Sequence, residues 1–190
     1  MAILEIRTFP DPILRQKTRP VDKFDANLKK LVDDMFDTMY DAPGVGLAAN
    51  QVGVSLRVVV MDVDYSVEED PKDENNRIYK NKNPLVIINP VLQKKSGKTL
   101  FKEGCLSVPG FSEQVERFEK VSIEYQKLDG SKAIIDAEGL LAIAFQHELD
   151  HLEGKLYIDR LSEIKRSLIK GKIRKERDKK FDRSKFHVEL

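Results

Sequence analysis

Two of the chain's three histidines, His147 and His151, lie four residues apart, and Glu148 follows the first of them. This H-E-x-x-H pattern constrains the fold because residues i and i+4 share one face of a helix, where both imidazoles can reach a single metal ion. Glu148 lies where it could handle the proton of a metal-bound water. The pattern therefore predicts a helix that carries part of a metal site, and it indicates a metal-dependent hydrolase.

Two histidines leave a divalent ion short of protein ligands. A thermolysin-like site would add a glutamate, but Glu163 and Glu176 do not stand out from a highly charged background. A metzincin would need a histidine where this chain has Tyr157. The single cysteine, Cys105, would complete a three-ligand site with one position open for water. A free cysteine is by itself more often a small buried hydrophobe, but beside the histidine motif we favour the ligand.

The 190 residues are enough for one substantial core and too few to require two domains. One cysteine cannot form an internal disulfide, so the fold needs no oxidising compartment. The segment Met1–Arg7 has neither the apolar run of a signal peptide nor that of a membrane span. These features predict a cytoplasmic protein that does not enter a membrane.

A net charge of +1 conceals an uneven distribution. Residues 161–190 contain 11 Lys+Arg and 5 Asp+Glu, whereas residues 1–160 contain 22 and 27. A basic tail of this kind favours an anionic partner such as RNA, although a solvated basic helix has the same composition.

Three helices are predicted. The first begins after Asp25 and buries an apolar stripe at Leu28, Leu31, Val32, Met35, Phe36 and Met39, before Ala42–Gly46 ends it. The second begins beyond Gly139, carries both histidines and stops near Gly154. The third begins near Ser162 and should point Ile164, Leu168 and Ile169 inward.

Strands are predicted at 56–63, at 85–92 with an interruption at Pro90, and at 121–126 and 133–136 around an Asp129–Gly130 turn. Residues 65–83 are charged and lack apolar periodicity, which indicates an exposed loop. The expected fold is α+β: mostly antiparallel sheets wrapped around a central helix with the H-E-x-x-H motif, followed by a C-terminal helix. Residues 1–160 would form the catalytic domain, and residues 161–190 would extend it as a basic helix and tail.

Three segments together resemble one family. Gly44-Val45-Gly46-Leu47-Ala48-Ala49-Asn50-Gln51, Glu103-Gly104-Cys105-Leu106-Ser107 and Gln146-His147-Glu148-Leu149-Asp150-His151 are similar to the three signature motifs of bacterial-type peptide deformylases, in the family's order. The resemblance runs from about Ile6 to about Leu161, and the basic helix beyond it also suits bacterial members.

The resemblance implies a hydrolase that removes the formyl group from the N-terminal formyl-methionine of newly made polypeptides and releases formate. It implies one divalent ion, usually Fe(II) with Zn, Ni or Co as alternatives, held by Cys105, His147 and His151. Glu148 would act as base and then acid, while the Gln51 amide and the Leu106 N–H would stabilise the oxyanion. The expected substrate-binding residues are Val45, Gly46, Phe101, Gly104, Leu140, Ile143 and Ala144. The five apolar side chains among them would form the walls of a methionine pocket, although each would suit a plain core equally well. The expected partners are the nascent chain and, through the basic helix, the ribosome, with no role for DNA.

Ser112 stands where many relatives have an arginine that contacts the peptide beyond the methionine. Arg117 matches a family arginine and could pair with Glu103, either as a brace behind the metal site or as a weak surface pair. Two other functions remain open from the residues: a peptidase that cuts internal amide bonds, and a catalytically silent, ribosome-associated binding protein.

Overall fold

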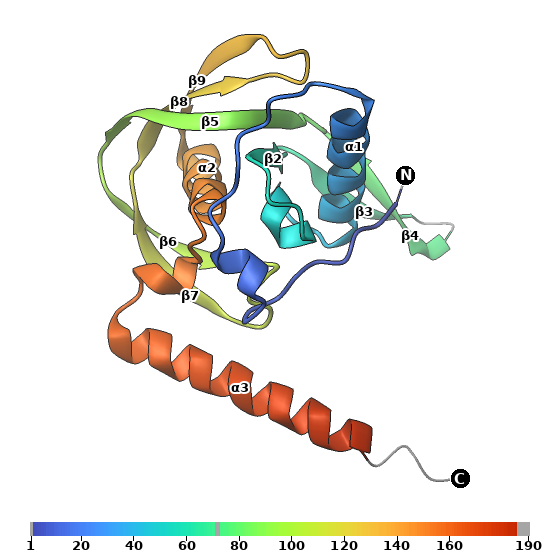
Figure 1. The fold of residues 1–190 in the computed structure, drawn as a ribbon, viewed down its shortest axis with the longest axis vertical. Coiled ribbons are helices and arrows are strands. Elements are labelled where there is room, and N and C mark those ends of the chain that lie inside the picture. Colours follow the sequence, from blue (N-terminus) through green and yellow to red (C-terminus); the bar gives the residue numbers. More distant parts are fainter. Residues whose placement is uncertain (1, 71–72, 186–190) are drawn as a thin grey trace.

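The computed structural model describes residues 2–70 and 73–185 (Figure 1). Its helices are η1 (Pro12–Arg15), α1 (Ala26–Asp41), η2 (Ala49–Val52), α2 (Gly139–Leu152), η3 (Tyr157–Arg160) and α3 (Glu163–Lys185), where η denotes a 3-10 helix. Its strands are β1 (Gly46–Ala48), β2 (Val58–Met61), β3 (Ser66–Asp70), β4 (Asp73–Lys80), β5 (Leu85–Ser96), β6 (Thr99–Gly104), β7 (Ser112–Arg117), β8 (Lys120–Gln126) and β9 (Lys132–Glu138).

Five strands form one antiparallel sheet in the order β1-β2-β5-β8-β9, and β3–β4 and β6–β7 form separate antiparallel pairs. Helix α2 lies between the five-stranded sheet and the β6–β7 pair (Figure 1). The predicted α+β class, with antiparallel sheets around a central helix that carries the histidines, is confirmed.

Strand β2 is buried on both faces because a helix packs against each of them. Val58 and Val60 join the apolar cluster of α1, while Val59 and Met61 join that of α2. Successive side chains of a strand point to opposite faces, so a continuous run of apolar residues is what such a strand requires. This arrangement places the start of the sheet, β1, directly beside α2.

The predicted ends of α1 and α2 are confirmed. The Asp25 side chain accepts hydrogen bonds from the N–H groups of Asn27 and Leu28, each at 3.0 Å, and α1 ends at Asp41. Helix α2 ends at Leu152, and Gly154 follows with φ at +70°. A Cβ at Gly154 would lie 2.5 Å from the Arg15 carbonyl oxygen, so this turn requires glycine.

The predicted interruption at Pro90 is also present. The register of β5 against β8 shifts between Ile88 and Val91, and Asn89 adopts a positive φ of 50°. Proline cannot donate to a ladder, so the strand continues past it through a bulge.

The expectation of an exposed loop at 65–83 is wrong, since most of this segment forms the β3–β4 hairpin. Its strands run past Val67 and Ile78 with charged residues between, and Lys80 pairs with Glu68. The hairpin stands apart from the main sheet (Figure 1). It therefore lacks the alternation of a half-buried strand, the signal on which the sequence prediction relied. Pro71 lies outside the described residues.

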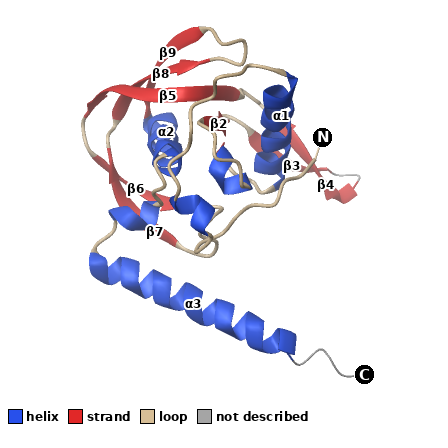
Figure 2. Cartoon of the chain, viewed as in Figure 1, coloured by secondary structure: helices blue, strands red, loops and turns tan. Residues whose placement is uncertain are grey.

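The prediction for α3 is only partly correct. Ile169 is buried, but Ile164 and Leu168 are 75% and 60% exposed. Ile164 and Leu168 share a helical face because they are four residues apart, whereas Ile169 lies about 100° further round the helix. Only the Ile169 side reaches the body of the protein, along which α3 runs on the outside (Figure 2). None of the described helices combines the length and apolarity needed to cross a membrane.

Candidate active site

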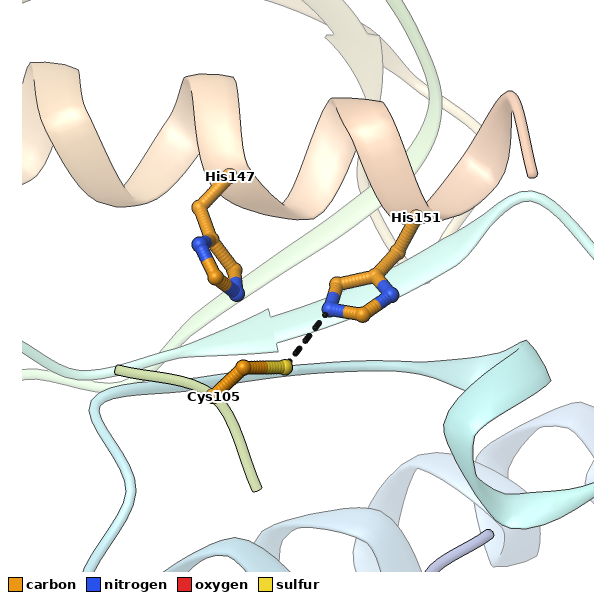
Figure 3. Close-up of side chains that lie close together, drawn as sticks. All are labelled: Cys105, His147 and His151. Atoms are coloured by element: carbon orange, nitrogen blue, oxygen red, sulfur yellow. Dashed lines mark hydrogen bonds between the residues drawn. The ribbon is translucent and has the colours of Figure 1, made fainter. Parts of the chain in front are cut away.

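Three potential metal ligands converge from two elements. Helix α2 presents His147 and His151 one turn apart, and Cys105 follows the end of β6 (Figure 3). The Cys105 Sγ lies 3.2 Å from the His151 Nε2, and one potential ligand atom from each residue lies within 4.8 Å of the others. Among the described residues this is the one such group that could hold a metal ion.

The chemistry of this group suits a divalent transition metal. His151 is fully buried, its Nδ1 has no partner in the described part of the chain, and burial lowers its pKa well below the ordinary value. Burial alone would lower the pKa of His147 as well, but the neighbouring Cys105 and Glu103 raise it instead. Burial therefore favours the neutral form of His151, and the negative groups around His147 favour positive charge on that imidazole. A thiolate and two imidazoles form a donor set that suits iron, zinc, nickel or cobalt.

A buried ionic network orients His147. Its Nδ1 lies 2.8 Å from the Glu103 Oε2, which leaves Nε2 facing the other ligands. Arg117 donates from Nε and Nη2 to Glu103 at 2.5 and 2.8 Å, and from Nη1 to Asp150 at 2.6 Å. Burial alone would raise the pKa of Glu103, but the bonds from Arg117 and His147 outweigh it and lower the pKa to about 2.

This network decides between the two interpretations of Arg117. The Arg117 and Glu103 side chains are 1% and 3% exposed, so they do not form a weak surface pair. Asp150 and Arg160 complete the network through a bond of 2.6 Å from Nη2 to Oδ1. The sequence prediction missed both residues, although Asp150 lies inside the histidine motif.

Glu148 lines the same cleft and is 5% exposed, and its Oε2 has no hydrogen-bond partner among the described residues. Burial raises its pKa to about 7, so the carboxyl can both accept and release a proton near neutral pH. Gly46 makes room for it, because a Cβ at position 46 would lie 2.5 Å from the Glu148 Oε1. Any side chain at position 46 would therefore displace the Glu148 carboxyl group.

Gln51 is held with its amide nitrogen toward the ligand group. Its Oε1 accepts from the Ala48 N–H at 2.8 Å, and its Nε2 lies 3.1 Å from the Ser107 Oγ and 3.7 Å from the Cys105 Sγ. Leu106 also lines the cleft, and no hydrogen bond from its N–H is found within residues 2–70 and 73–185. Gln51 thus places an amide donor beside Cys105, and the neighbouring Leu106 has an N–H without a partner among the described residues.

Asn50 is a further residue that the sequence prediction missed. It is fully buried, and its Nδ2 donates to the His151 carbonyl oxygen at 2.6 Å. This bond ties η2 to the C-terminal end of α2. Asn50 could have been identified from the sequence because it directly precedes Gln51 in the first motif.

The cleft has a volume of 560 Å³, and all seven predicted substrate-binding residues line it: Val45, Gly46, Phe101, Gly104, Leu140, Ile143 and Ala144. Val45, Phe101 and Leu140 are about 40% exposed at its rim, whereas Ile143 and Ala144 are buried. An apolar recess beside polar donors is typical of a ligand site rather than of plain core. Ser112 also lines the cleft.

The positions that a metzincin or a thermolysin-like enzyme would use for its third ligand do not supply one here. Tyr157 is buried, and its ring stacks on that of His147 with centroids 6.3 Å apart. Glu163 lines a separate depression on the outer side of α3. The side chain of Glu176 lies outside the described part of the chain. The thermolysin-like alternative therefore has no support from Glu163.

The family model, the similar sequences and the similar structures all indicate the same protein family. The model of polypeptide deformylases matches residues 3–167. The peptide deformylase of Alkalilimnicola ehrlichii is 47% identical over 175 residues, which cover 92% of this chain and 91% of that protein. That of Stutzerimonas stutzeri is 50% identical over 176 residues, covering 92% and 96%. The crystal structure of peptide deformylase from Ehrlichia chaffeensis is 41% identical, with a TM-score of 0.82 over 95% of this chain and 99% of that chain.

Proposed function

Since the chain belongs to the polypeptide deformylase family, we propose roles for its cleft residues in removing the formyl group from an N-terminal formyl-methionine. The enzyme is a hydrolase that acts on newly synthesised polypeptides and releases formate. The observation that carries the proposed roles is the convergence of Cys105, His147 and His151 in a cleft that also contains the buried, unpartnered Glu148.

Members of this family are metalloenzymes, and Cys105, His147 and His151 would hold one divalent ion. When bound, the ion supplies Lewis acidity that makes water a nucleophile near neutral pH. We propose Fe(II) as the native metal from the family resemblance. Zn, Ni and Co remain chemically compatible with the donor set.

Glu148 would take the proton of the attacking water and later deliver it to the departing amine. Its carboxyl faces the cleft without a partner, so no competing bond needs to break first. The Gln51 Nε2 and the Leu106 N–H would donate to the oxygen that gains negative charge. Each such donor typically contributes about 10²–10³-fold to the rate.

The apolar part of the cleft would receive the methionine side chain. Phe101, Leu140 and Ile143 supply its wall, and the peptide backbone would lie near Val45 and Pro109 as an added strand. Strand β1 is at the edge of its sheet, so one side of it is available for such pairing. A formyl carbon bears only hydrogen, so a tight site can exclude an acetyl group by sterics.

The decisive experiment measures formate released from a formyl-Met peptide by protein purified without oxygen and loaded with Fe(II), together with the Cys105→Ala variant. We expect release by the wild type, loss of at least about 100-fold in the variant, and metal content falling from about one ion per chain toward zero. The metal found in anaerobically purified protein tests the choice of iron.

Absence of formate from folded, metal-loaded wild type would contradict these roles and favour the silent binding protein. Cleavage of unformylated peptides would instead favour the internal peptidase.

We further propose that the enzyme works in the cytoplasm, where its substrate is made, and docks on the ribosome through the outer side of α3. Lys172 and Lys175 are exposed there. Residues 1–160 would form the catalytic unit and residues 161–190 its extension. Truncation after Arg160 would also remove buried Leu161 and Ile169, so charge substitution is the sharper test.

Changing both Lys172 and Lys175 to glutamate should weaken co-sedimentation with ribosomes, and the loss should be largest at low salt, where the charges are least screened. The same change at two exposed lysines, Lys94 in β5 and Lys127 just after β8, is the matched control and should leave binding unchanged. Equal binding by all three proteins would contradict docking through α3.

A further inference from the structure

An aromatic cluster of Tyr40, Tyr65 and Tyr79 fastens the β3–β4 hairpin to the end of α1. The Tyr40 and Tyr65 rings meet edge to face with centroids 5.1 Å apart, and the Tyr40 and Tyr79 centroids are 5.5 Å apart. The Lys82 Nζ lies 4.1 Å from the Tyr40 centroid, as a cation–π contact. Since Tyr65 directly precedes β3 and Tyr79 belongs to β4, the base of the hairpin packs on α1.

Two hydroxyls of this cluster bond to different parts of the backbone. The Tyr65 hydroxyl donates to the Gly44 carbonyl oxygen at 3.0 Å, and the Tyr79 hydroxyl donates to the Tyr40 carbonyl oxygen at 2.9 Å. Gly44 lines the cleft, whereas Tyr40 lies in α1 and does not. One bond therefore reaches the substrate site, and the other reaches only the supporting helix.

Residues 43–45 form the stretch of cleft wall between α1 and β1. The Gly44 N–H donates to the Met39 carbonyl oxygen at 2.9 Å, and the Val45 carbonyl oxygen accepts from the Asp62 N–H at 3.0 Å. The Tyr65 hydroxyl therefore adds a side-chain bond to two backbone bonds. No other hydrogen bond to the Gly44 carbonyl is found among the described residues.

The position of this stretch affects both sides of the cleft. A Cβ on Gly44 would lie 2.9 Å from the Leu106 Cδ1, and β1 follows directly with Gly46 against Glu148. A shift of residues 43–45 would therefore change the space in which a peptide has to lie. It need not move the metal ligands, which belong to α2 and to the segment after β6.

We propose that Tyr65 is a positioning residue for substrate binding, whose hydroxyl holds the Gly44 carbonyl and with it residues 43–45 in the conformation that receives the formyl-methionine peptide. The inference rests on the proposed function of the cleft. It also assigns a role to the β3–β4 hairpin, which keeps Tyr65 in place against Tyr40 and Tyr79.

The test compares Tyr65→Phe with Tyr79→Phe, which both keep the ring and remove a hydroxyl that donates to a backbone carbonyl. For Tyr65→Phe we expect KM for a formyl-Met peptide to rise about threefold to tenfold, with kcat within about twofold of wild type. For Tyr79→Phe we expect an unchanged KM. Hydrogen exchange should quicken over residues 42–47 in Tyr65→Phe alone.

Equal KM values for the two variants, whether unchanged or raised together, would overturn the inference, because a merely structural role predicts no difference between them. If wild type releases no formate, the proposed function fails separately. The hydrogen-exchange comparison then decides the positioning role, and equal exchange over residues 42–47 in both variants would reject it.

Discussion

Replacing Glu148 by glutamine is expected to lower kcat/KM for a formyl-Met peptide by about 10²–10⁴-fold, the usual contribution of a positioned proton-transfer group. Glutamine matches the shape of glutamate but cannot take up a proton from water. Because the Glu148 Oε2 has no partner within the described residues, its replacement breaks no bond that holds the fold. Formate release by metal-loaded protein is the measurement.

Two controls separate catalysis from damage to the site. The variant should bind as much metal as wild type, because the three ligand residues are unchanged. Glu153→Gln, just beyond the same helix, alters a carboxylate that pairs with Arg57 and Lys17 and should keep full activity. Wild-type turnover by Glu148→Gln with full metal content would exclude Glu148 as the proton carrier.

Replacing Arg117 by methionine is expected to reduce the free energy of unfolding by about 3–5 kcal/mol. The guanidinium is buried between Glu103 and Asp150, so its removal leaves Glu103 without its arginine in a low-dielectric interior, whereas Asp150 keeps Arg160. Urea unfolding of the metal-free protein measures this loss without a contribution from metal binding.

Arg160→Met is the matched control, because Arg160 also bonds to Asp150 but its side chain is 43% exposed. Its loss should cost about 1 kcal/mol or less. Adding Glu103→Gln to Arg117→Met should recover part of the stability, since the uncompensated charge is then gone. Equal losses for the two arginine variants would show that burial does not set the strength of this network.

The regular elements that pack against the core were predictable from local pattern. The stripe of α1, its Asp25 cap and the glycine after α2 each follow from helical periodicity or backbone conformation within a few residues. The β3–β4 hairpin and α3 were predicted less well. Both lie largely outside the main sheet and bury few side chains. Their sequences therefore lack the regular spacing of apolar residues from which secondary structure is predicted.

For the active site, too, residue spacing predicted one part and could not predict another. The spacing of His147 and His151 determines by itself that both imidazoles share a helical face, because the helix repeats every 3.6 residues. The family motifs further indicated the candidate roles of Cys105, Gln51 and Leu106. Spacing alone could not place these residues, since they are separated from α2 by at least one strand pair.

The tertiary structure decided what lies around these residues. It brings the Cys105 Sγ within 3.2 Å of His151, buries Arg117 between two carboxylates, and sets Gly46 against Glu148. It also joins Tyr65 to Gly44 across 21 residues of sequence. Such contacts depend on how sheets and helices pack together, and no local period in the sequence records them. The sequence by itself therefore determined which chemistry the chain could carry, and the packing of β6, β1 and the hairpin around α2 determined the geometry in which that chemistry is held.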